Sequence, residues 1–172
     1  SSGVLKLIEK QNFETFDLCF YEGNEKFNME RILARAKAYA EGFDGASMRN
    51  LLFMGTTGLG KTHLSSAIAK VIIDNGYDVV YESAQNIFAD FEYERFSRGY
   101  NTDVQNEKTA RYFETDLLII DDLGTEVANQ FTLSCIYDVI NARINNRRST
   151  IINTNLTMGD IAARYTPRIA SR

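Results

Sequence analysis

Apolar positions along the chain follow two patterns, short unbroken runs and longer segments in which they recur every three or four residues. The short runs, typical of strands covered on both faces of a sheet, are 51–54, 79–81, 117–120 and 150–152. The segments with helical spacing are 28–41, 62–74, 84–98 and 130–146. This alternation predicts an α/β fold with a mostly parallel central sheet flanked by helices, and a ligand at the carboxyl ends of the strands.

A glycine-rich segment follows the first apolar run. Residues 55–62 are Gly-Thr-Thr-Gly-Leu-Gly-Lys-Thr, the pattern of a phosphate-binding loop between a strand and a helix. Glycines let backbone N–H groups approach phosphate oxygens, and the positive end of the following helix faces the same oxygens. A turn could carry this motif by chance, but the flanking strand and helix favour binding of ATP or ADP. The predicted nucleotide contacts are Gly55, Thr56, Thr57, Gly58, Leu59, Gly60, Lys61, Thr62 and His63.

A pair of acids ends the apolar run 117–120. Lys61 would reach the β- and γ-phosphates, Thr62 and Asp121 would hold Mg²⁺, and Asp122 would orient the attacking water. Two acids after a strand are a weak signal alone. They begin 60 residues after Lys61, with a predicted strand and helix between, and this spacing makes the signal strong.

The strand at 150–152 is followed by Asn153-Thr154-Asn155. An amide at this place could contact the γ-phosphate or the water, or could simply form a turn. Near the other end of the chain, Phe13 and Phe16 could line an adenine pocket or pack beneath the sheet. Their chemistry alone favours packing.

The segment after residue 94 mixes aromatic and basic side chains. Phe96 and Tyr100 are interleaved with Arg95 and Arg98, a combination suited to stacking bases and holding phosphates of single-stranded DNA. The alternative is a solvated loop with packed aromatics. Residues 99–108 are polar, and we expect a mobile loop there.

Composition limits the class of protein. With 172 residues, of which 44% are hydrophobic, the chain is long enough for one domain with a core. A net charge of −4 means that any nucleic-acid site must be local. Cys19 and Cys135 lack metal-ligand spacing, and the chain has no long apolar run, so we expect ordinary thiols in a soluble, cytoplasmic protein. The terminal residues indicate a fragment of a longer protein.

With these motifs established, the chain resembles AAA+ ATPases of the bacterial replicative helicase loader group (DnaC/DnaI-like), which is related to IstB-like ATPases. The resemblance rests on five segments: 12–16, 55–62, 121–126, 153–156 and 164–172. It implies a P-loop NTPase fold of AAA+ type with the C-terminal lid truncated or absent. Residues 1–45 would form an adenine-side segment and helix, residues 46–172 the P-loop core, and an N-terminal helicase-binding domain would be missing.

The resemblance also implies a function and several residue roles. The protein would bind and hydrolyse ATP, self-associate, and assist loading of the replicative DNA helicase onto single-stranded DNA. An Asp-Asp pair where relatives commonly have Asp-Glu implies slow turnover. Alternatives are an IstB-like transposition helper ATPase, or an ATP-regulated adaptor without significant hydrolysis. Asn155 would be the sensor-1 residue with Asn153 as second choice, and Phe13 and Phe16 would lie beside adenine.

Arginines are concentrated toward the end of the chain. A cationic surface is expected there, formed by Arg143, Arg147, Arg148, Arg164, Arg168 and Arg172. On a continuous helix, the last three would share one face, although a solvated stripe would look the same. By resemblance, Arg168 would act as an arginine finger on the ATP of a neighbouring subunit, with Arg172 as the second candidate.

Overall fold

The computed structural model describes residues 2–55, 60–97, 103–125 and 128–165. In the N-terminal half of the chain its elements are α1 (Ser2–Lys10), a 3-10 turn η1 (Leu18–Phe20), α2 (Gly23–Glu41), β1 (Leu51–Met54), α3 (Lys61–Asp74) and β2 (Val79–Ser83). The C-terminal half continues with α4 (Ala84–Ser97), α5 (Asp103–Glu114), β3 (Leu117–Leu123), α6 (Gln130–Asn145), β4 (Ser149–Thr154) and α7 (Met158–Arg164).

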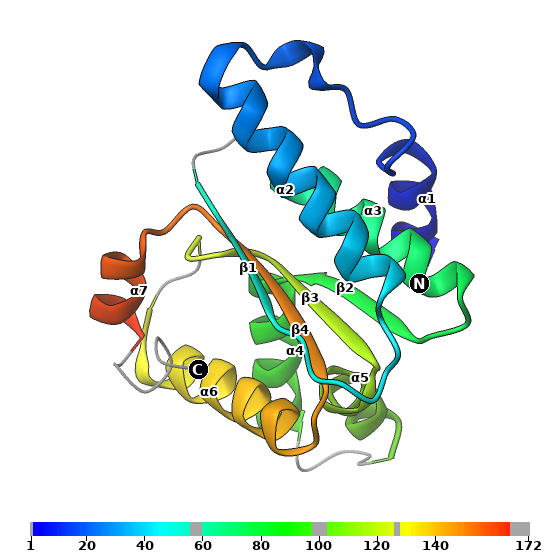
Figure 1. Cartoon of the computed structure of the whole chain (residues 1–172). Helices are drawn as coiled ribbons and strands as arrows, with labels where there is room; N and C mark the ends of the chain where they lie inside the picture. The colour runs from blue at the N-terminus through cyan, green and yellow to red at the C-terminus, as the bar shows by residue number, and fades with distance from the viewer. Residues whose placement is uncertain (1, 56–59, 98–102, 126–127, 166–172) are drawn as a thin grey trace.

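The described strands form a parallel sheet with the order β1-β4-β3-β2 (Figure 1). The two central strands are almost entirely buried, as their unbroken apolar runs predicted, whereas the edge strands β1 and β2 are half-exposed. Met54 pairs with Thr154 and Ser83 pairs with Asp121, so the carboxyl ends of all four strands meet at one edge. The predicted α/β fold with a parallel sheet is confirmed.

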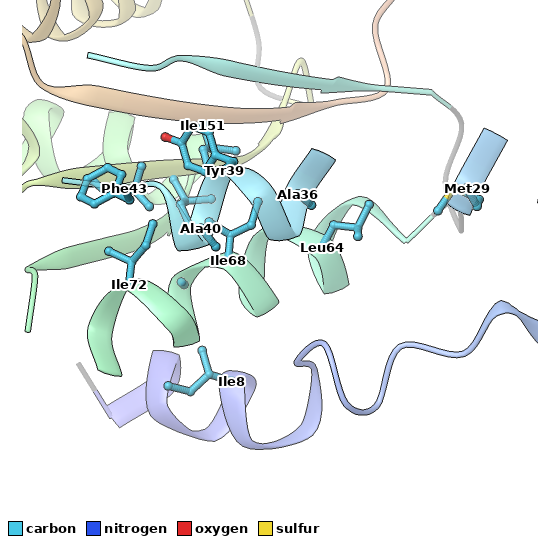
Figure 2. Close-up of a cluster of buried hydrophobic side chains, with 13 residues drawn as sticks. Ile8, Met29, Ala36, Tyr39, Ala40, Phe43, Leu64, Ile68, Ile72 and Ile151 are labelled. Carbon is cyan, nitrogen blue, oxygen red and sulfur yellow. The ribbon is translucent and has the colours of Figure 1, made fainter. Parts of the chain in front are cut away.

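Helices α1, α2 and α3 cover one face of the sheet (Figure 1). The core between them is built from small and branched side chains, which lets the helices approach the sheet closely. Figure 2 shows these side chains converging from α2, α3 and the sheet, among them Ala36, Ala40, Ile68, Ile72 and Ile151. Helix α3, which follows the candidate phosphate loop, lies on this face.

Helices α4, α5, α6 and α7 cover the opposite face (Figure 1). Their core contains Phe88, Tyr112, Ile136, Val139 and Ile161, packed on the other side of the central strands. Helix α6 matches the predicted segment 130–146 to within one residue. Asn129 and Thr132 form a reciprocal capping box at its start.

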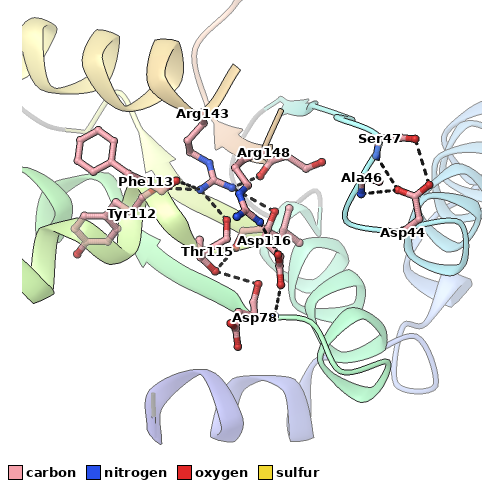
Figure 3. Close-up of polar contacts among 12 residues, drawn as sticks. Asp44, Ala46, Ser47, Asp78, Tyr112, Phe113, Thr115, Asp116, Arg143 and Arg148 are labelled. Atoms are coloured by element: carbon pink, nitrogen blue, oxygen red, sulfur yellow. Dashed lines mark hydrogen bonds and ion pairs between the residues drawn. The ribbon is translucent and has the colours of Figure 1, made fainter. Parts of the chain in front are cut away.

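A buried arginine ties this second layer to the sheet (Figure 3). Arg143 on α6 is 0% exposed and donates hydrogen bonds to the carbonyl oxygens of Tyr112 (3.0 Å), Thr115 (3.0 Å) and Ser149 (2.6 Å), and to the Thr150 hydroxyl (3.0 Å). Two of these carbonyls lie at the carboxyl end of α5, where the helix dipole favours a cation. The expectation that Arg143 belongs to a cationic surface is therefore wrong.

Three further differences from the sequence predictions concern helices. The expected loop at 99–108 is wrong from Asp103 onward, because α5 begins there; residues 99–102 lie outside the described part. Helix α1 was not predicted, and α2 begins at Gly23 rather than near residue 28. Among the described helices, none is long and apolar enough to cross a membrane.

Candidate nucleotide-binding site

The flanks of the glycine-rich segment have the backbone that a phosphate loop needs. Strand β1 leads into Gly55, whose φ is +133°, and Gly60 directly before α3 has φ +76°, both in the region that favours glycine. Residues 56–59 of the predicted loop lie outside the described residues. The predicted strand and helix on either side are both confirmed.

Lys61 stands at the start of α3 with its side chain turned back over the loop. Its ammonium group donates to the carbonyl oxygen of Gly55 at 2.7 Å. Burial lowers the pKa of Lys61, while the charges of Asp122 and Asp121 act in the opposite direction. The amino group therefore lies at the Gly55 carbonyl and within electrostatic reach of the paired carboxylates.

Asp121 is the centre of the polar contacts at the carboxyl end of β3. Its Oδ2 accepts hydrogen bonds from the Tyr81 hydroxyl at 2.9 Å and from the Thr62 hydroxyl at 3.3 Å. Its Oδ1 accepts from the Asn153 amide at 3.0 Å and from the backbone N–H of Asp122 at 3.1 Å. Residues from α3, β2, β3 and β4 thus converge on one carboxylate.

The arrangement fits a bound magnesium ion. Mg²⁺ takes oxygen ligands at about 2.0–2.1 Å in an octahedron, so neighbouring ligand oxygens stand about 2.9 Å apart. The oxygens of Thr62 and Asp121 are 3.3 Å apart, close to that spacing, and both are hard oxygen donors. Both side chains predicted to hold the metal are therefore together in the fold.

Asp122 has an unusual backbone for a residue of a strand. Its φ is +52°, and the register between β3 and β4 shifts between Ile120 and Leu123, which marks a bulge at the two acids. The Asp122 side chain is exposed at this bulge. Partial burial and then the charge of Asp121 raise the pKa of Asp122, while Lys61 opposes the shift. A raised pKa makes this carboxylate a better proton acceptor.

The two candidate asparagines differ in their surroundings. Asn153 lies inside β4, is buried, and holds both Asp121 and the Ser65 hydroxyl, the latter at 2.7 Å. Asn155 follows the strand and is exposed. Asn153, the second choice of the sequence analysis for sensor 1, is thus in contact with the predicted metal ligand; the sensor-1 role stays a prediction for both Asn155 and Asn153.

The N-terminal segment lies directly against the loop. A side chain at Gly60 would approach both the Phe16 ring and the Tyr21 hydroxyl to 3.1 Å. His63 on α3 holds this segment, because its Nε2 donates to the Asn12 carbonyl at 2.8 Å and its ring meets that of Phe16 edge-on at 5.0 Å.

The contacts of Phe13 and Phe16 are compatible with both predicted roles, packing beneath the sheet and lining an adenine pocket. Phe13 and Phe16 are half-buried against the first core, as packing requires. Only Phe16 is also beside Gly60. The adenine-side role of the pair stays a prediction.

Two of the candidate DNA-contacting residues, Arg95 and Phe96, lie on the last turn of α4. Phe96 is 77% exposed, far more than a core aromatic. Arg95 is also exposed, with its guanidinium 5.2 Å from the centre of the Phe131 ring. Arg98 and Tyr100 lie outside the described residues.

The arginines near the end of the chain do not share one continuous helix. Helix α7 ends at Arg164, and Tyr165 has an extended backbone, so the expected four-residue helical spacing does not continue from Arg164. Arg164 donates to the carbonyl oxygen of Gly124, in the loop after the paired acids. Arg168 and Arg172 lie outside the described residues.

Two residues of the site were not identified from the sequence. Tyr81 was recognised only as part of a strand, and Tyr21 was not singled out. A tyrosine near the end of a predicted strand was the available signal for Tyr81. Its contact with Asp121 could be predicted only if the strand next to β3 were known.

Comparisons with known proteins identify the family and the fold of the chain. The family model described as IstB-like ATP binding protein matches residues 4–168. The replicative helicase loader DnaC of Buchnera aphidicola subsp. Baizongia pistaciae is 27% identical over 155 residues, which cover 90% of this chain and 59% of that protein. The crystal structure of the DnaC helicase loader aligns with a TM-score of 0.79 and 24% identity, over 96% of this chain and 93% of that chain.

A second solved structure with a similar fold carries a nucleotide. The replication initiator DnaA bound to AMPPCP and single-stranded DNA aligns with a TM-score of 0.74 and 25% identity, over 95% of this chain and 47% of that chain. Fold and site together define a P-loop NTPase of the AAA+ type. Within that class, the chain belongs to the IstB-like ATP binding protein family. It spans 59% of the Buchnera loader that it matches.

Proposed function

We propose that this protein binds and slowly hydrolyses ATP with Mg²⁺, and that in this cycle it assists loading of a replicative DNA helicase onto single-stranded DNA. The observation that carries the ATP site is the convergence of Lys61, Thr62 and Asp121 at the carboxyl edge of the sheet. Similarity to the loader DnaC supports the helicase as partner.

Each polar residue has a distinct task in this proposal. Mg²⁺, when bound, would offset the negative charge of the phosphate oxygens. The Lys61 ammonium binds phosphate oxygens, and the Thr62 hydroxyl with the Asp121 carboxylate provides the metal ligands from the protein. Asp122 orients the attacking water and accepts its proton, for which its raised pKa is suited. Self-association would add an arginine from a neighbouring subunit.

A transposition helper ATPase is the second candidate, because the matching family model is IstB-like. It would use the same nucleotide chemistry with a different protein partner. A third possibility is an adaptor in which ATP only orders the protein. Steady-state phosphate release in the presence of single-stranded DNA separates this adaptor from both ATPases.

Lys61→Ala should weaken ATP binding by roughly 10- to 100-fold, because hydrogen bonds to a charged group contribute about 1.5–3 kcal/mol. Fluorescent-nucleotide titration measures the affinity. A pull-down with the full-length protein measures ATP-dependent capture of the host's replicative helicase, which Lys61→Ala should weaken. Lys70→Ala is the matched control, since Lys70 lies on the same helix but is exposed and paired with Asp74. Unchanged ATP affinity would refute the phosphate loop, and capture of a transposase instead of the helicase would favour the second candidate.

Phe96→Ala should weaken binding of single-stranded DNA by about 1–3 kcal/mol, the contribution of one base stacked on an aromatic ring. The side chain is 77% exposed, so its loss should leave thermal stability and ATP affinity nearly unchanged. Fluorescence anisotropy with a labelled oligonucleotide gives the affinity. Phe27→Ala provides the control, as Phe27 is 60% exposed on α2 across the sheet. Equal DNA affinity of the two variants would contradict a role of Phe96 in stacking on DNA bases.

A further inference from the structure

A tyrosine on the edge strand donates a hydrogen bond to the carboxylate that is proposed to bind the metal. Tyr81 lies on β2, its ring packs against the first hydrophobic core, and its hydroxyl donates to Asp121 Oδ2 at 2.9 Å. Strand β2 pairs only with β3 in the described sheet (Figure 1). The contact therefore links an edge strand to the centre of the nucleotide site.

The hydrogen bonds to Asp121 differ in length, and the difference indicates which one a metal would replace. The contacts from Tyr81 and the Asn153 amide measure 2.9 and 3.0 Å, whereas Thr62 stands at 3.3 Å from Oδ2 and 3.4 Å from Oδ1. Thr62 itself is a predicted metal ligand, so its long contact is the one that a metal held by both side chains would replace. The shorter contacts from Tyr81 and Asn153 would then be the ones that orient the carboxylate.

We propose that Tyr81 is a positioning residue that orients Asp121 for Mg²⁺, without touching the nucleotide or the metal. This inference rests on the proposed ATP and Mg²⁺ site. Partners of this kind typically change metal affinity by about 10- to 100-fold when they are removed.

The test is a magnesium titration of nucleotide binding with Tyr81→Phe, which removes one hydroxyl and keeps the ring. Fluorescent ADP is held at fixed concentration, and the Mg²⁺ midpoint is read from its fluorescence. We expect the midpoint to rise at least about 10-fold, with nucleotide affinity in EDTA unchanged. That second value shows that the phosphate loop is intact in the variant.

Tyr112→Phe is the matched control. It also removes a tyrosine hydroxyl that donates to a carboxylate, that of Asp90, but from a fully buried residue in the layer of α4 and α5. Its Mg²⁺ midpoint should equal that of the unmodified protein. A Tyr81→Phe midpoint within twofold of the unmodified protein would overturn the positioning role while leaving the proposed function standing. If the unmodified protein binds nucleotide with no dependence on Mg²⁺, the proposed metal site and this inference both fail.

Discussion

Arg143→Met should lower the free energy of unfolding by about 3–5 kcal/mol. The substitution removes the donors of buried carbonyl oxygens on Tyr112, Thr115 and Ser149, and a buried acceptor without its donor costs about 1–3 kcal/mol. Burial lowers the pKa of Arg143 to about 10, which still leaves the guanidinium protonated at neutral pH. Among the described residues the hydrogen bonds of the buried guanidinium go to carbonyl and hydroxyl oxygens, whose dipoles stabilise the charge.

Chemical denaturation measures the loss, and thermal unfolding should shift down by about 6–20 °C for a chain of this length. Arg148→Met is the control because Arg148 forms a half-exposed ion pair with Asp116 at 2.8 Å, and such pairs contribute about 0–1 kcal/mol. Arg143→Lys keeps the charge but not the planar fork, so it should also be destabilised. Equal stability of Arg143→Met and Arg148→Met would contradict the role of Arg143 in linking α5 to β4.

Arg143 also illustrates what the sequence could not reveal. An arginine among other arginines predicts an exposed cationic surface, since charged residues are rarely buried. Its burial depends on three segments that are distant in the chain, the end of α5, the start of β4 and α6, which meet only in the fold. No local sequence pattern predicts that these three segments come together.

The nucleotide site was predictable to the extent that its parts are local. Strand β1 and the helix that begins with Lys61 and Thr62 are close in the chain, and Asp121 and Asp122 follow an apolar run, so the sequence predicted the elements that carry these residues. The bulge at Asp122 was not predictable, because it arises from the pairing of β3 with β4. The same holds for Tyr81, whose contact requires β2 to lie beside β3.

Helix α5 shows a different limit. Its N-terminal half is polar and was taken for loop, and its helical state is supported farther along by Tyr112, which is fully buried against Phe91 and the second core. Packing of such a face commonly outweighs weak local preference. For Asn153 and Asn155 the local pattern correctly predicted polar residues at the end of a strand. It did not predict that β4 continues to Thr154, so that Asn153 lies inside the strand and Asn155 after it.

Arg168→Ala should leave ATP affinity unchanged and reduce turnover by roughly 10³- to 10⁵-fold, the usual contribution of an arginine finger. This corresponds to about 4–7 kcal/mol of activation free energy. The prediction rests on the family to which the chain belongs, since Arg168 itself lies outside the described residues. A planar, permanently charged guanidinium that can bind two phosphate oxygens suits the task.

Mixing two inactive variants gives the sharper test. Lys61→Ala protein lacks a working phosphate loop but keeps its arginines, so a Lys61→Ala subunit should supply Arg168 to the intact ATP site of an Arg168→Ala neighbour. Phosphate release by the mixture should therefore exceed that of either variant alone. Arg164→Ala is the comparison within the same stretch, because Arg164 already donates to the Gly124 carbonyl inside its own subunit and should act through that loop. If the two variants co-assemble by light scattering yet the mixture stays inactive, Arg168 is not the finger, and Arg172 becomes the residue to replace in the same experiment.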